Sequence, residues 1–391
     1  MNVHEQNLLS LLRTALWSRT ADASLLREAP DWRTLLRLAE KQTVTGLIYD
    51  AALTLPPSQQ PDGELLRTLH LHTVRIAQSH QLLNTTLAEI TQRFQAEGIR
   101  TVLLKGQGVA HYYPNPLRRG CGDIDLYVGE PEYTRVCRLL NEWGMLNGEK
   151  TAESIQHLHF TYNSVCIEIH RIAGIMFSHR RNRLFRRWSD ELLQEDSYNT
   201  MQIDGTLAEA GGTQVLLPPV RFDAFYLFYH TYKHFLTGGV GLRQFCDWTM
   251  YLHDFADEID RTALKEDLHR FRLLHPWQVM GHIAVRHLGL PQEDFPFFSA
   301  DAGVKKTADA MLELILQSGN FGFHNPNHTR RPDGYLAGKL HSFRLMHRRL
   351  WQVFPLCPAD TLCYYSAFLT KGIAQLFKDT FTKPIITGAA R

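Results

Sequence analysis

Residues 98–129 read GIRTVLLKGQGVAHYYPNPLRRGCGDIDLYVG, and this stretch decides the fold that the sequence predicts. The apolar run at 101–104 is typical of a buried strand, and the glycines that follow Lys105 predict a turn from strand to helix. After a loop with two prolines, the alternating segment 123–128 predicts a second strand. We expect the rest of the chain to support or cover this strand–helix–strand unit.

The alternation of the second strand places its acidic side chains together. Side chains two positions apart on a strand point the same way, so Asp123 and Asp125 share one face while the apolar residues between them face a core. Two adjacent carboxylates repel each other, and a divalent cation bound between them removes the repulsion. Oxygen ligands suit Mg²⁺, which usually takes one or two carboxylates together with substrate phosphates. The pair therefore predicts a site for Mg²⁺ or Mn²⁺.

A third acid lies in segment 165–170, which alternates in the same way and places Glu168 and His170 on one face. If this strand neighbours the aspartate strand, three carboxylates can hold two metals about 3.5–4 Å apart, the spacing used for phosphoryl or nucleotidyl transfer. A solvent-facing glutamate is the alternative, and His170 is either part of the surroundings of the site or a core histidine. On the strand before it, His157 and His159 lack the further Cys or His that a zinc site needs.

Cationic candidates flank the aspartates. Lys105 and Gly106 stand where a strand turns into a helix, and backbone N–H groups and the helix dipole at such a turn favour an anion. We therefore predict that these two residues contact a phosphate, with a surface lysine as the alternative. Arg119 is expected to hold either the phosphate tail or the loop that precedes the aspartates.

The chain after Pro218 reads as helices and offers four more candidates. His230 and His234 are neighbours on one side of a helix, where they can bind a metal, close the cleft or pack in a core. Arg243 and Asp247 are also four residues apart, which suits either a structural helix pair or residues that line the cleft.

Several of these segments resemble the polymerase-beta-like nucleotidyltransferase superfamily, above all LLKG with its short helix, Tyr113-Pro114, and Arg119 four residues before Asp-Ile-Asp-Leu. Within it the chain looks most like a bacterial branch known as an uncharacterised nucleotidyltransferase family. The resemblance extends over much of the chain, to segments 32–46, 157–160 and 167–170 and to His234, Gly241, Leu242, Arg243 and Asp247. One position departs from the pattern, because Lys105-Gly106 stands where the superfamily has Gly-Ser.

The resemblance implies metal-dependent transfer of a nucleoside monophosphate from an NTP, with ATP as the expected donor, to an unknown acceptor of the hydroxyl type. It implies that Asp123, Asp125 and Glu168 are both catalytic and metal-binding. The residues expected to bind the nucleotide and its metal from the remaining walls are Lys105, Gly106, Arg119, His170, His230, His234, Arg243 and Asp247. The missing Gly-Ser pair leaves open a nucleotide-binding protein of the same fold with little turnover. Water as the acceptor would instead make the chain a metal-dependent phosphohydrolase.

Composition bounds these hypotheses. The chain has 391 residues, of which 44% are hydrophobic and 21% charged, as in an ordinary globular protein. Its net charge of +2 gives no global basic field for nucleic acid, so the expected partners are a nucleotide and an acceptor. Scattered cysteines, no export signal and no apolar run long enough to span a membrane predict a cytoplasmic protein.

The predicted architecture is therefore α/β. A small mixed sheet of nucleotidyltransferase type with flanking helices is expected in residues 98–217. A helical region is expected on each side of it, at 1–97 and 218–391.

Overall fold

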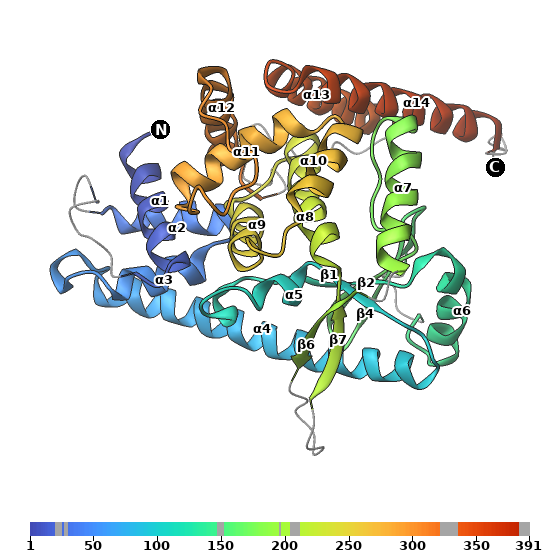
Figure 1. The fold of residues 1–391 in the computed structure, drawn as a ribbon, viewed down its shortest axis with the longest axis horizontal. Helices are drawn as coiled ribbons and strands as arrows, with labels where there is room; N and C mark the ends of the chain where they lie inside the picture. Colours follow the sequence, from blue (N-terminus) through green and yellow to red (C-terminus); the bar gives the residue numbers. More distant parts are fainter. Residues whose placement is uncertain are drawn as a thin grey trace, which may run out of the picture.

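The computed structural model describes residues 1–19, 26, 30–146, 152–194, 197–203, 212–320 and 335–382. The strands in this part of the chain are β1 (Val102–Leu104), β2 (Asp123–Tyr127), β3 (Ala152–Glu153), β4 (His157–Tyr162), β5 (Val165–His170), β6 (Asn199–Ile203) and β7 (Thr213–Leu217). They form one mixed sheet in the order β3-β4-β5-β2-β1-β7-β6. The predicted class, a mixed sheet with flanking helices between helical N- and C-terminal regions, is confirmed (Figure 1).

Helices precede, interrupt and follow the sheet. Before it lie α1 (Val3–Leu16), α2 (Trp32–Gln42), α3 (Thr45–Leu53), the 3-10 turn η2 (Pro57–Gln59) and α4 (Gly63–Ala96). Between strands lie α5 (Gly106–Ala110), the 3-10 turn η3 (Pro116–Arg118), α6 (Gly129–Glu142) and α7 (His179–Gln194). After it come α8 (Val220–Thr237), α9 (Leu242–Asp254), α10 (Arg261–Arg270), α11 (Leu274–His287), α12 (Ala302–Ser318), α13 (Tyr335–Val353) and α14 (Pro358–Thr382). Among the described helices, none is long and apolar enough to cross a bilayer.

A glycine turn joins the long helix α4 to the first strand of the sheet. Gly98 has a φ of 68°, a left-handed conformation that glycine adopts without steric cost. Its N–H donates to the Gln95 carbonyl, and the Ile99 N–H donates to the Phe94 carbonyl, both at 2.9 Å. This pattern closes the helix C-terminus and satisfies carbonyls that the helix leaves free. The chain then enters β1 without a long loop.

The central strands bring distant parts of the sequence into register. β1 pairs antiparallel with β2 and parallel with β7, while β2 pairs parallel with β5. In the β2–β5 register Asp125 lies opposite Glu168, so the two carboxylates project from the same face of neighbouring strands. β4 and β5 form the hairpin expected from Asn163-Ser164.

One face of the sheet packs against α4 and α6. The alternating apolar residues of the strands form this core with the inward sides of the two helices, and its members include Leu87, Ile90, Phe94, Val136, Leu140, Ile124, Leu126, Ile167 and Ile169. Figure 1 shows α4 crossing the strands of the sheet, with the helices that follow the sheet in the upper part of the view. The polar side chains of β2 and β5 therefore point away from this core.

The opposite side is covered by helices from both ends of the chain, which share a second core. The Trp17 indole N–H donates to the Leu288 carbonyl at 2.7 Å. The buried side chain of Gln42 donates to the Ile315 carbonyl at 3.1 Å and accepts from the Leu242 N–H at 3.0 Å. The domain boundaries expected at 97/98 and 217/218 are not tested by these contacts and stay predictions.

Replacing Gln42 with alanine should lower the free energy of unfolding by about 1–3 kcal/mol, because it leaves the buried Leu242 N–H without the side-chain oxygen that accepts from it. Gln317 is a matched control on α12, since it is exposed and its side-chain amide donates to Glu313 at 3.3 Å. Gln317→Ala should change stability by less than about 0.5 kcal/mol. Urea unfolding measures both, and equal losses would contradict the role of Gln42.

Candidate active site

A cavity of about 290 Å³ lies between the polar face of the sheet and helices α8 and α9. Its lining includes all the residues that the sequence predicted for the site, namely Lys105, Gly106, Arg119, Asp123, Asp125, Glu168, His170, His230, His234, Arg243 and Asp247. The structure thus brings together residues that are far apart in the chain. Their roles in binding and catalysis stay predictions.

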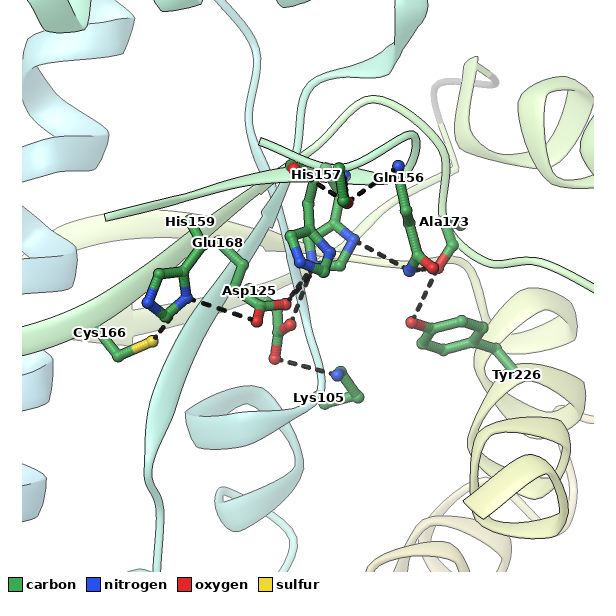
Figure 2. Close-up of polar contacts among 11 residues, drawn as sticks. Lys105, Asp125, Gln156, His157, His159, Cys166, Glu168, Ala173 and Tyr226 are labelled. Atoms are coloured by element: carbon green, nitrogen blue, oxygen red, sulfur yellow. Dashed lines mark hydrogen bonds and ion pairs between the residues drawn. The ribbon is translucent and has the colours of Figure 1, made fainter. Parts of the chain in front are cut away.

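Asp125 is the most buried carboxylate of the cavity, at 1% exposure. One oxygen accepts a hydrogen bond from His170 Nε2 at 2.9 Å, and the other lies 3.1 Å from Lys105 Nζ. Figure 2 shows Lys105 reaching Asp125 from the strand beside it. Burial opposes ionisation, yet the positive charge of Lys105 and the hydrogen bond from His170 hold the pKa of Asp125 below its ordinary value. The group is therefore a carboxylate at neutral pH.

Asp123 behaves differently, because its carboxylate has no hydrogen bond or ion pair in the described part of the chain. The charge of Asp125, followed by burial, raises the pKa of Asp123. At Glu168 burial is outweighed by the hydrogen bond from His170, and the pKa falls. An unpartnered carboxylate next to two others is a donor set that fits a divalent cation with oxygen ligands. Asp123, Asp125 and Glu168 would hold such an ion.

Two histidines complete the acidic side of the cavity. His170 Nε2 lies between the carboxylates, 2.9 Å from Asp125 and 3.2 Å from Glu168 Oε2. Burial alone would lower the pKa of His170, but the hydrogen bonds to both acids raise it overall. His157 Nδ1 lies 3.5 Å from the same Glu168 oxygen (Figure 2). These three residues place one possible ligand atom each within 4.8 Å of one another.

The sequence analysis missed His157 as part of this cluster, although a signal was available. The two-residue turn at Asn163-Ser164 pairs Tyr162 with Val165, and counting outward along the hairpin pairs His157 with His170. The spacing along the chain was compared only with that of zinc ligands, which considers His157 together with His159. In the hairpin, the second histidine of the cluster is His170, which lies across the strand pair from His157.

Lys105 adopts a strained backbone conformation at the strand-to-helix turn. Its φ of 59° and ψ of −147° lie in a region that favours glycine and costs other residues on the order of 1–3 kcal/mol. This is the position where the residue pattern noted above departs from Gly-Ser. The strain is offset by the ion pair with Asp125, and that pair raises the pKa of Lys105 against the opposing effect of burial.

Arg119 contacts protein groups rather than open space in the cavity. Its Nε and Nη2 each donate to one oxygen of Asp247 at 2.7 Å, which is a buried two-point ion pair. The Arg119 carbonyl accepts from His80 Nε2 of α4, also at 2.7 Å. Of the two expected roles, these contacts favour holding the loop before the aspartates over holding a phosphate.

Asp247 is tied to this loop and not to its helical neighbour Arg243. The Tyr113 hydroxyl donates to Asp247 at 2.7 Å, in addition to the two bonds from Arg119. Arg243 instead donates through Nη1 to the Gly120 carbonyl. The structural helix pair considered from the i, i+4 spacing is therefore wrong, since tertiary partners outcompete the helical neighbour. Both residues line the cavity, the other alternative.

The wall opposite the acids is cationic or neutral. His230 and His234 of α8 stack edge to face, with ring centroids 4.5 Å apart. Burial, followed by the nearby positive charge of Lys105, lowers the pKa of His230 well below its ordinary value and that of His234 to about 4. Both imidazoles are therefore neutral at pH 7 and face the acids together with Lys233 and Arg243. The Nε of Arg243 is buried and has no hydrogen bond within the described residues.

Comparison with known proteins gives one family and one structural neighbour. The family model described as an uncharacterised nucleotidyltransferase matches residues 28–289, a range that includes the whole cavity lining. No curated protein matches the chain. An antigenic nucleotidyltransferase-like protein from Paracoccidioides brasiliensis is similar over 52% of this chain and 92% of its own, with 14% identity and a TM-score of 0.30.

Asp247→Asn should destabilise the protein by about 3–5 kcal/mol, because it leaves the buried Arg119 guanidinium without its counter-charge. The exposed pair between Lys305 and Asp309, at 2.6 Å, provides the control. Asp309→Asn should cost less than about 1 kcal/mol. Chemical unfolding of both variants tests this, and a small effect at Asp247 would show that Arg119 finds another partner.

Proposed function

Because the chain belongs to the uncharacterised nucleotidyltransferase family, we propose that it moves a nucleoside monophosphate from an NTP to an acceptor hydroxyl in a metal-dependent reaction. The observation that carries this proposal is the cluster of Asp123, Asp125 and Glu168 on neighbouring strands, in a cavity whose opposite wall is cationic or neutral. ATP as donor and membership of the polymerase-beta-like superfamily belong to the same proposal. So does a cytoplasmic location, which six free cysteines support.

The chemistry asked of the residues is mostly positioning and charge neutralisation. Mg²⁺ or Mn²⁺ held by the three carboxylates would neutralise phosphate charge and lower the pKa of the attacking hydroxyl. The buried Nε–H of Arg243 makes no hydrogen bond within the described part of the chain, and Arg243 would donate to a phosphate oxygen. Neutral His230 and His234 would donate or accept hydrogen bonds without adding charge. Arg119 would keep Asp123 in place through the loop before β2.

A second candidate function is nucleotide binding with little turnover. The observation that favours it is the ion pair of Lys105 with Asp125, because Lys105 occupies a carboxylate oxygen that would otherwise bind the metal. In this candidate Lys105 serves as a permanent counter-charge. The two functions differ in whether an NTP is consumed.

Asp123→Asn should abolish binding of Mg²⁺–NTP while leaving the protein folded, because the change removes a charge from a repelling pair and creates no cavity. Asp294→Asn is the control, since this carboxylate pairs with His253 outside the cavity lining. Calorimetric titration with each NTP and Mg²⁺ measures the affinity. Unchanged affinity in Asp123→Asn would refute the assignment.

Glu168→Gln should bind Mg²⁺–NTP with near-normal affinity but turn over at least roughly a hundredfold more slowly, the scale of one lost electrostatic contact in the transition state. Glu168 lies on β5, farther from the Lys105 turn than the aspartates, and would act on the acceptor side. Single-turnover kinetics with labelled NTP decides the matter. Pyrophosphate with a labelled acceptor means transferase, orthophosphate or free nucleotide means phosphohydrolase, and binding without products means the second candidate.

A further inference from the structure

One group of possible metal-ligand atoms in the cavity contains nitrogen as well as oxygen. His157 Nδ1, Glu168 Oε2 and His170 Nε2 come from the β4–β5 hairpin and lie around one point, beside the Asp123–Asp125 pair. Glu168 Oε2 is 3.5 Å from His157 Nδ1 and 3.2 Å from His170 Nε2. His157 Nδ1 is buried and makes no hydrogen bond within the described residues. A buried imidazole nitrogen without a hydrogen bond is unfavourable, and a metal ion bound between it and the Glu168 carboxylate would satisfy both groups.

These distances suit a shared metal ion. Ligand atoms about 2.1 Å from one metal, at angles of 90–110°, lie roughly 3.0–3.5 Å from each other. The two contacts of Glu168 Oε2 fall in this range, so small side-chain movements would bring all three donors to bonding distance. Two imidazoles and one carboxylate that leave other positions open form a recognised set for transition metals.

We propose that His157, Glu168 and His170 form a mixed nitrogen–oxygen site that takes a first-row transition-metal dication in preference to Mg²⁺. Imidazole binds these metals well, whereas Mg²⁺ prefers oxygen ligands and retains its water. The site uses Glu168 in common with the proposed catalytic carboxylates and thereby specifies which metal that function employs. Only the catalytic role of this site rests on the proposed function, because metal binding to the site requires no nucleotide.

The surroundings of the cluster hold the His170 side chain in place. Its Nδ1 lies 3.4 Å from the side-chain amide of Gln156, which is in turn 3.4 Å from the Ala173 carbonyl (Figure 2). The Gln156 amide nitrogen faces both Nδ1 and the Ala173 carbonyl, so metal binding at Nε2, which leaves the proton on Nδ1, would require this amide to move. The Tyr226 hydroxyl also donates to the Ala173 carbonyl, at 3.1 Å, and so holds this segment against α8.

His159 provides a matched control on the same strand. It stands opposite Glu168 in the hairpin, but its Nδ1 is 3.8 Å from the other Glu168 oxygen and 3.4 Å from Cys166 Sγ. It is therefore outside the three-residue cluster. Because a thiol lies beside it, Zn²⁺ would be an ambiguous probe. Mn²⁺ suits carboxylate and water ligands rather than thiolate, so it avoids the Cys166 thiol, and its ligands can be identified by electron spin resonance.

The test is Mn²⁺ and Mg²⁺ binding to the full chain without nucleotide. Calorimetry should show that the wild type binds Mn²⁺ more tightly than Mg²⁺. His157→Asn should weaken Mn²⁺ binding by at least about tenfold, since even indirect partners of metal ligands contribute about 10–100-fold. His159→Asn should leave it unchanged. Equal Mn²⁺ affinities in the wild type and His157→Asn would overturn the proposal.

Electron spin-echo spectra of bound Mn²⁺ in the wild type give a readout that needs no variant to fold. Two directly coordinated imidazole nitrogens are expected, one of which should disappear in His157→Asn. Absence of nitrogen coupling in the wild type would sink the proposal. Asp123→Asn separates it from the transfer reaction, because this variant should lose NTP binding and keep the nitrogen coupling.

Discussion

The buried carboxylate of Asp125 is the constraint on which the rest of the site depends. A carboxylate at 1% exposure is stable in its charged form only if other groups offset the lost hydration. Lys105 and His170 do so from two directions, one on each oxygen. The backbone of Lys105 adopts a conformation that favours glycine. The interaction of its ammonium group with Asp125 therefore offsets the backbone strain at this turn. Asp123, beside this charge-balanced group, has no hydrogen bond or ion pair within the described residues and can accept one more positive charge.

Rigid support for these acids comes from outside the sheet. The loop between η3 and β2 is held from α9 by Asp247 and Arg243 and from α4 by His80, and the preceding η3 is held by the bond between Arg118 and Asp50 of α3. A two-point arginine pair in a buried setting fixes both distance and orientation. The helical region therefore supplies one wall of the cavity and also fixes the start of the strand that carries the aspartates.

The acidic cluster has two kinds of donor, and this has a chemical consequence. On β2 the donors are oxygens alone, whereas the β4–β5 hairpin adds imidazole nitrogens on the same face. The identity of the bound cation depends on which ligand atoms coordinate it, because hard metals prefer oxygen and borderline metals also bind imidazole nitrogen well. The opposite wall, with neutral histidines and a buried guanidinium N–H, suits phosphate oxygens. The groups proposed to bind metal and the groups proposed to bind phosphate therefore lie on opposite walls of the cavity.

Local patterns in the sequence determined the elements and the direction of their side chains. Alternation at 123–128 and 165–170 gave both strands and the polar face that they share, and the Asn163-Ser164 turn contained the register that pairs His157 with His170. These features depend on neighbours within a few residues, which is why a sequence can specify them. Only the tertiary structure decided that β5 lies parallel to β2, and that Asp247 pairs with Arg119 and not with Arg243. Such contacts join residues far apart in the chain, and their selection depends on burial and on competing partners that no local spacing encodes.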